Sequence, residues 1–452
     1  MQPVVQPKAS RPQLGLIACV ALVVGNMIGS GIFLLPASLA AYGPIAIAGW
    51  IVTSIGAIAL AIIFGRLARV MPKTGGPYVY TRASFGEFMG FLIAWGYWVA
   101  LWAGNAGVAV AFAGYAGHFY PALAGGFGGL AVALGALWLV TLINIRGVGE
   151  AGIVQIVTTV LKLLPLLMLA LVGPASIDRA NLTPLDSSGQ GIFPAIAACT
   201  ALTLWAFLGL ESATVPAGSV RDPDRTIPLA TVIGTAFAAL IYILVTVVAF
   251  GTVPRTGLAA SSAPLALVAD RLWGGTGAVF IALGALVSTF GTLNGFTLLA
   301  GQVPLGAAQN GTFPGWFGVL SRGGAPVNAL MAAGVLASAL IAMSLSHSLV
   351  DQFTFIISLA TFASLVPYAF CAFAELVLLA QNPARQRPPQ GLGRLIALSL
   401  VAFAYAAGAI YGIGPEVVFW GFILLLSGLP VYVWLKFRQP HGESGVLPPA
   451  PT

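Results

Sequence analysis

The chain has 452 residues, of which 59% are hydrophobic and only 7% are charged. Soluble domains carry about a quarter charged residues, so this composition excludes a water-soluble globular protein. The net charge of +7 indicates no nucleic-acid partner, because a cytoplasmic excess of Lys and Arg and their attraction to anionic lipid explain it.

Long apolar runs follow one another along the chain, and each is long enough for a helix that crosses a bilayer core about 30 Å thick. A closed barrel would need short strands of alternating polarity, whereas Ile45–Phe64 is apolar on every face. We therefore expect an all-α polytopic membrane protein with twelve transmembrane helices. In chain order they are predicted at 15–42, 45–68, 88–117, 125–145, 152–174, 194–218, 228–252, 277–305, 326–346, 352–380, 394–411 and 416–437.

Lysine and arginine side chains orient these helices, because they gather in cytoplasmic loops. With the N-terminus inside, only Arg179, Arg255 and Arg271 fall in outside loops, and Lys162 falls within a span. The predicted inside segments hold the others: Lys8, Arg11, Arg66, Arg69, Lys73, Arg82, Arg146, Arg221, Arg225, Arg322, Arg385, Arg387, Arg394, Lys436 and Arg438. We expect both termini in the cytoplasm and a bacterial inner (plasma) membrane location, with the lipid bilayer as a partner.

The chain lacks the side-chain sets of an enzyme. Its three cysteines lie far apart in apolar segments, with no metal-binding spacing, and its three histidines are scattered. No nucleophile with a base, paired carboxylates, P-loop or dinucleotide motif is present. The sequence predicts a non-enzyme with no cofactor and no metal.

Glycines interrupt two of the predicted helices at matching positions. Gly29 stands seven residues before Pro36, and Gly209 stands seven residues before Pro216. The two interrupted helices are five spans apart, so the second half of the chain must be inserted upside down relative to the first. We predict a first repeat at 15–174 and a second at 194–380, followed by two helices at 394–437. Cytoplasmic tails are predicted at 1–14 and 438–452.

Broken helices at matching positions of an inverted repeat indicate a transporter site. The alternative is a close-packed interface of small residues. At a break, the free N–H groups and positive dipole end of a half-helix suit a carboxylate. The carbonyl ends suit an ammonium group or another cation.

Motifs spread in order along the whole chain resemble the amino acid/polyamine/organocation superfamily, and within it the basic amino acid and polyamine antiporters of the arginine/agmatine and putrescine/ornithine type. The motifs are Gly25–Gly31 with Phe33 and Pro36, Pro72–Tyr78 with Phe85-Gly86, Tyr97-Trp98, Gly104-Asn105, Thr203–Ala213, Thr297–Gln302 and Leu365–Tyr368. The resemblance implies a five-plus-five inverted repeat of the LeuT-like type with helices 1 and 6 broken. It also implies a possible homodimer through helices 11 and 12.

The same resemblance implies a substrate site. Its carboxylate-binding part would fall on Ser30 and Gly31 at the Gly29 break, and a stacking aromatic on Trp205. The second stacking residue, a tryptophan in the arginine exchanger, is here Phe296, a weaker partner for guanidinium. The remaining implied substrate contacts are Asn26, Met27, Ala100, Leu101, Asn105 and Ser358.

Two ionisable residues lie at membrane depth, where such groups are functional candidates. Glu211 follows the Gly209 break, and by resemblance it is the gating acid; the alternative is a carboxylate that caps the second half-helix. By the same resemblance Tyr97 is a lid, and the alternative is a tyrosine of the core. Lys162 lies deep in the fifth span. We hypothesise that it places a fixed or protonatable cation between the first helix and Thr292, for ion or proton coupling. The alternative is a permanently charged strut bonded to backbone carbonyls.

Three functions follow. The first is an antiporter that exchanges a cationic amino acid for its decarboxylated amine, as an arginine/agmatine exchanger does. The second is a proton-coupled or facilitative permease for neutral amino acids, favoured by Phe296, Leu101 and Lys162. The third is a sensor that binds the solute without moving it. Sequence does not choose among substrates, because selectivity rests on a few contacts worth about 1–3 kcal/mol each.

Overall fold

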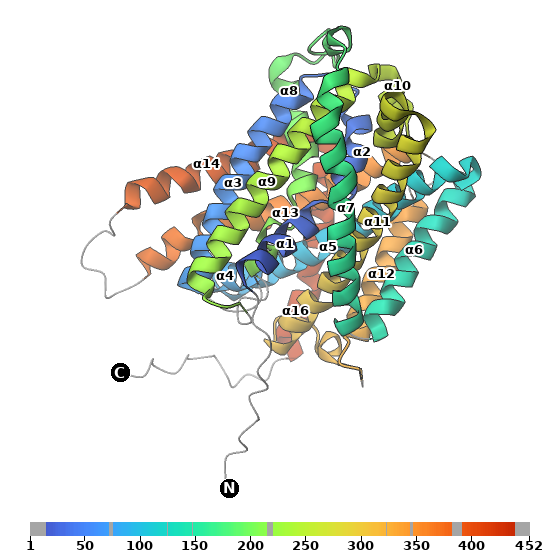
Figure 1. The fold of residues 1–452 in the computed structure, drawn as a ribbon. Coiled ribbons are helices and arrows are strands. Elements are labelled where there is room, and N and C mark those ends of the chain that lie inside the picture. Colours follow the sequence, from blue (N-terminus) through green and yellow to red (C-terminus); the bar gives the residue numbers. More distant parts are fainter. Residues whose placement is uncertain are drawn as a thin grey trace.

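The computed structural model describes residues 15–71, 76–123, 125–146, 148–214, 220–321, 323–343, 347–381 and 391–438, and of 148–157 only the backbone. Helices make one bundle (Figure 1). The longer ones are α1 (Leu16–Met27), α2 (Ser30–Leu39), α3 (Ala46–Val70), α4 (Pro77–Phe85), α5 (Glu87–Phe119), α6 (Gly126–Arg146), α7 (Val148–Val172), α8 (Ile192–Leu204), α9 (Pro223–Thr252), α10 (Arg255–Ala260), α11 (Pro264–Gln309), α12 (Val327–Met343), α13 (Leu349–Ala380), α14 (Leu392–Ile413), α15 (Pro415–Leu426) and α16 (Gly428–Arg438). Short 3-10 turns are η1 (Pro121–Leu123), η2 (Gly173–Ser176), η3 (Arg179–Leu182), η4 (Trp205–Phe207), η5 (Leu210–Thr214) and η7 (Gly315–Gly318).

The prediction of an all-helical chain is confirmed for the described residues, where eleven helical segments are long and apolar enough to cross a membrane. At the remaining predicted position the structure has α12, an apolar helix of 17 residues, which is shorter than the other candidates. The predicted tails fall outside the described residues, except for Arg438 at the end of α16.

The structure differs from the predicted boundaries at several places. Helix α11 begins at Pro264 instead of 277, and Gly274 interrupts it with a φ of 70°. Helices α4 and α10 were not predicted, because with 9 and 6 residues they are too short to cross a membrane. The last predicted span is divided at Ser427 into α15 and α16.

Helix α5 is at the centre of the bundle, with 89% of its most apolar window buried. It packs along α11 and α13, while α3 packs along α9. The C-terminal helices are peripheral: the buried share falls to 28% in α14 and 17% in the α15–α16 segment. The interrupted helices α1 and α2 lie among α7, α9 and α11 (Figure 1).

Candidate functional site

The first break lies between α1 and α2. Helix α1 ends at Met27, Ile28 is extended with φ −75° and ψ 97°, and α2 begins at Ser30. A Cβ at Gly29 would lie 2.6 Å from the Oγ1 of Thr292 on α11. The glycine therefore permits a close approach of the broken backbone to α11.

The second break follows α8 and the η4 turn. Leu208 is extended, and Gly209 has a φ of 100°, a conformation that favours glycine. A Cβ at Gly209 would lie 3.0 Å from the Cβ of Asn26, so the two breaks face each other. Pro216 and Ala217, which complete the predicted punctuation, lie outside the described residues.

Cationic and hydroxyl groups satisfy the carbonyl end of α1. The Lys162 ammonium, fully buried, donates to the carbonyl oxygen of Gly25. Ser288 and Thr292 on α11 both lie with Oγ 3.4 Å from the carbonyl oxygen of Ile28. Lys162 and Thr292 thus bond to the same broken segment from α7 and α11. A cation at a helix C-terminus is electrostatically favourable.

The first turn of α2 faces an aromatic pair. The indole Nε1 of Trp205 donates to Ser30 Oγ at 3.2 Å, and a Cβ at Gly31 would lie 2.8 Å from that of Ala206. Trp205 and Phe296 meet edge to face, with ring centroids 5.9 Å apart. Free N–H groups at the start of a half-helix can bind an anion, and the two rings supply adjacent π faces.

Glu211 links two helices near the second break. Its Oε1 accepts a hydrogen bond of 2.6 Å from the Tyr97 hydroxyl on α5, and its Oε2 accepts one of 2.6 Å from Tyr368 on α13. Its side chain is 1% exposed, and no Lys or Arg of the described chain forms an ion pair with it. Burying a carboxylate without a countercharge is costly unless hydrogen bonds satisfy it, and these two do so.

Tyr97, Glu211 and Phe296 line a central cavity of about 10 Å³, room for about one water molecule. An amino acid does not fit in such a volume, so the structure is a closed conformation and solute entry requires helices to move. The lining residues come from α5, η5, α11, α13 and the Gly209 break: Tyr97, Ala100, Leu101, Leu208, Gly209, Glu211, Phe296, Leu299 and Ser364.

Four of the predicted substrate residues line cavities, and they line two different ones. Ala100, Leu101 and Phe296 line the central cavity, whereas Ser358 lines a separate cavity of about 400 Å³ among α2, α8 and the first turns of α13. Asn105 is 2% exposed, and its side-chain oxygen accepts no hydrogen bond from any described group. Met27 is buried with its sulfur 3.9 Å from the Thr235 hydroxyl.

Sequence reasoning missed three contributors to this site. Tyr368 stands within a recognised motif, but its bond to Glu211 depends on α13 meeting η5. Ser364 lines the cavity without any motif. A Cβ at Gly104 would lie 3.0 Å from Trp205 and 3.1 Å from Phe296, so this glycine leaves room for both rings.

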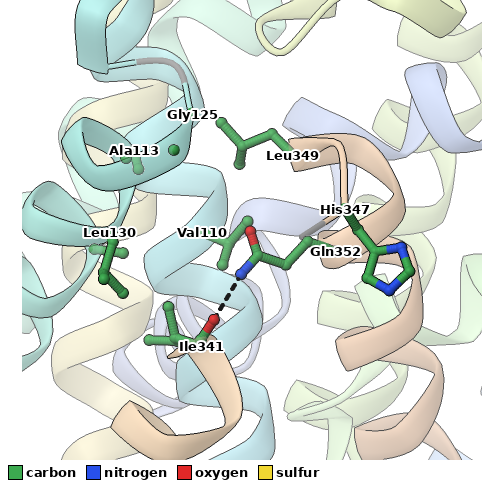
Figure 2. Close-up of a pocket in the computed structure, with 11 residues that line it drawn as sticks. Val110, Ala113, Gly125, Leu130, Ile341, His347, Leu349 and Gln352 are labelled. Carbon is green, nitrogen blue, oxygen red and sulfur yellow. Dashed lines mark hydrogen bonds between the residues drawn. The ribbon is translucent and has the colours of Figure 1, made fainter. Parts of the chain in front are cut away.

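Other cavities do not resemble a solute pathway. Figure 2 shows one of about 20 Å³, where Gln352 donates to the carbonyl oxygen of Ile341 opposite Val110 and Leu130. Two larger cavities, of about 550 and 480 Å³, share Trp316 and are lined almost entirely by aromatic and aliphatic side chains. Such apolar surfaces suit lipid better than a charged or zwitterionic solute.

Comparison with known proteins identifies the family. A model described as amino acid permease matches residues 14–435. The cadaverine/lysine antiporter of Escherichia coli (strain K12) is 35% identical over 375 residues, which cover 80% of this chain and 83% of that protein. The putrescine transporter PotE of Haemophilus influenzae is 31% identical, covering 95% and 98%. A putative arginine/ornithine antiporter of Bacillus subtilis (strain 168) is 33% identical, covering 93% and 96%. The chain therefore belongs to the amino acid permease family of the amino acid/polyamine/organocation superfamily, a family of multi-pass membrane transporters.

Proposed function

We propose that the chain is a secondary antiporter that exchanges a cationic amino acid for its decarboxylated amine across the bacterial inner membrane. The observation that carries this proposal is the position of Glu211: a buried carboxylate without a cationic partner among the described residues, at the wall of the central cavity. A cationic solute would supply the missing positive charge. The names of the relatives, which pair lysine with cadaverine and arginine with ornithine, support a cationic substrate.

In the proposed binding mode, the substrate carboxylate meets the first turn of α2 at Ser30 and Gly31. Its charged side chain extends past Trp205 and Phe296 toward Asn105, whose side-chain oxygen has acceptor capacity left. A decarboxylated amine would keep the contacts with Trp205, Phe296 and Asn105. It would lose the carboxylate contacts at the first turn of α2. Exchange requires both solutes to bind the same site, and this division of contacts allows it.

The opposed breaks also support the proposed five-plus-five inverted repeat, 15–174 and 194–380. Transport would move α1 and α2 together with α8 and η5 against the remaining helices. The low burial of α14 and α15–α16 supports a homodimer through these segments, because such apolar surface requires lipid or another protein. We propose that both termini face the cytoplasm, as the distribution of Lys and Arg predicts.

Lys162 gives this proposal a coupling element. We infer that its ammonium competes with other cations for the carbonyl end of α1, where Gly25 and Ile28 present their oxygens. If the Lys162 ammonium releases its proton during the transport cycle, transport is coupled to protons. If it does not, Lys162 is a fixed strut that lets the fold work without a metal cation.

Proteoliposome uptake of labelled lysine, ornithine, arginine and their decarboxylated amines tests the exchange. Vesicles are loaded with unlabelled amine, with unlabelled amino acid, or with buffer alone. We expect rapid uptake only into loaded vesicles, and competition between each amino acid and its amine. Equal uptake into empty vesicles would refute obligatory exchange.

A second candidate is a proton-coupled or facilitative permease for neutral amino acids. It is favoured by the apolar lining around Phe296, with Leu101 and Leu299 beside it. Uptake of labelled leucine into empty vesicles, accelerated by an acidic exterior, would support this candidate. Saturable binding of a solute without uptake under either condition would indicate a sensor.

A further inference from the structure

The cavity of about 400 Å³ near the N-terminal end of α13 has the groups of an ammonium site. Asp351 is at its rim, the rings of Tyr42 and Phe355 line its walls, and the hydroxyls of Thr354 and Ser358 lie further along α13. A carboxylate with aromatic faces and hydroxyl acceptors is the usual protein environment for an ammonium or guanidinium group. The residues that line the cavity include no lysine or arginine.

The lining residues of α13 form a path into the bundle. Asp351, Thr354, Phe355 and Ser358 are spaced as i, i+3, i+4 and i+7, so they share one helix face and cover about 10 Å of rise. The path ends at Ser358, which is 8% exposed and was predicted as a substrate contact. A hydrogen bond of 2.8 Å between the hydroxyl oxygens of Thr354 and Ser38 joins α13 to α2, the second half of the broken first helix.

No charged side chain of the described chain forms an ion pair with Asp351, so its carboxylate can bind a cation. Its Oδ2 accepts a hydrogen bond from Ser348, the N-cap of α13, and the residue is exposed and lines the cavity. The described cation on the adjoining α10 is Arg255, which donates to the carbonyl oxygen of Ser187 at 3.4 Å.

We propose that this cavity of about 400 Å³ is a transient binding site for the ammonium or guanidinium group of an incoming cationic substrate. The predicted orientation assigns it to the outer face, and we call it the vestibule. Asp351 supplies the anionic group, and Tyr42 and Phe355 supply the aromatic walls. The proposal rests on the proposed exchange of cationic solutes. Its consequence is selectivity at entry, because a single carboxylate in a recessed mouth concentrates cations before they reach the closed gate.

Initial-rate uptake by purified Asp351→Asn protein in amine-loaded proteoliposomes tests the vestibule. With labelled cationic amino acid outside, we expect KM to rise about two- to fivefold with little change in kcat, as for an exposed charge pair. The difference should shrink when ionic strength rises from about 0.01 to about 0.1 M, because the Debye length falls from about 30 to about 10 Å. Asp351→Glu should restore the KM.

Two control variants separate the charge of Asp351 from other roles of the residue. Ser348→Ala removes the helix cap but keeps the carboxylate, so KM should stay at the wild-type value. Asp270→Asn removes an exposed carboxylate of α11 that does not line the vestibule, and KM should again stay unchanged. A wild-type KM and salt dependence in Asp351→Asn that still exchanges cationic solutes would overturn the vestibule while leaving the exchange intact. Wild-type protein that transports only neutral amino acids would refute both.

Discussion

Arg66 and Glu375 form a bidentate ion pair that joins α3 to α13. The Nε and one terminal nitrogen of Arg66 donate to the two carboxylate oxygens of Glu375 at 2.7 and 2.6 Å. The carboxylate side chain is 6% exposed and the guanidinium side chain 44% exposed. Because α13 also carries Tyr368, this ion pair stabilises the helix that holds the Glu211 contact.

The unequal exposure predicts unequal mutational effects. Arg66→Ala leaves a buried carboxylate without a partner and should cost about 1.5–3 kcal/mol of unfolding free energy, whereas the guanidinium left by Glu375→Ala can reach solvent, and that variant should lose less. Denaturant titration in detergent measures both. Arg69→Ala is the matched control, because Arg69 is exposed at the end of α3 and donates to a backbone carbonyl, that of Asp224 on α9. A larger loss for Glu375→Ala would contradict the burial argument.

The tyrosine pair around Glu211 predicts a change in gating. Tyr97→Phe and Tyr368→Phe each remove one hydrogen bond to a carboxylate, worth about 1.5–3 kcal/mol, and should shift the protein away from the closed conformation. We expect increased labelling by a membrane-impermeant thiol reagent of a cysteine introduced at Ser364, and a lower exchange rate. Tyr242→Phe, which loses a bond to the neutral carbonyl of Ala206, should leave the labelling unchanged. Unchanged labelling in both tyrosine variants would contradict the predicted gating role of Glu211.

Lys162→Met distinguishes a proton carrier from a strut. Both roles predict lower stability, by about 1–3 kcal/mol, because the Gly25 carbonyl loses its donor inside the bundle. Only the carrier role predicts that exchange rates no longer vary with pH. The exchange rate of the variant is measured over a pH series in vesicles with equal pH on both sides, beside Lys436→Met, which removes an exposed lysine paired with Glu87. A Lys162→Met protein with the wild-type pH profile would leave the strut role.

The Gly209 break predicts a strong asymmetry among glycine substitutions. Gly209→Ala places a Cβ in a left-handed conformation and 3.0 Å from Asn26, and should cost about 1–3 kcal/mol. Gly408→Ala is in regular helix α14 with nothing within 4 Å of the new Cβ, and should stabilise by about 0.5–1 kcal/mol. Thermal unfolding of the two variants in the same detergent compares them. Equal melting temperatures would mean that the break tolerates a side chain.

Sequence predicted the helices and the two breaks because both depend on local composition: apolar length for the spans, and Gly29 and Gly209 for the interruptions. It also placed a charge beside each break. It did not predict which side chains pair with the buried carboxylates. Glu375 bonds to Arg66, 309 residues away in sequence, because the packing of α3 against α13 decides which cation is in reach. The bond from Tyr368 to Glu211, and the position of Ser358 in a different cavity from Ala100, Leu101 and Phe296, are likewise consequences of packing.

Phe296→Trp tests whether the aromatic wall selects the cation. An indole face binds guanidinium more strongly than a phenyl face does, and a whole cation–π contact is worth about 0.5–2 kcal/mol, so kcat/KM for arginine relative to leucine should rise, by at most about thirtyfold. The larger ring has little room in the closed conformation, since a Cβ at Gly104 would already lie 3.1 Å from Phe296. We therefore expect part of the gain to be offset by slower closure. Phe290→Trp, on the same helix but packed against Phe112, should leave the ratio unchanged. An unchanged ratio in Phe296→Trp would mean that substrate does not contact this ring.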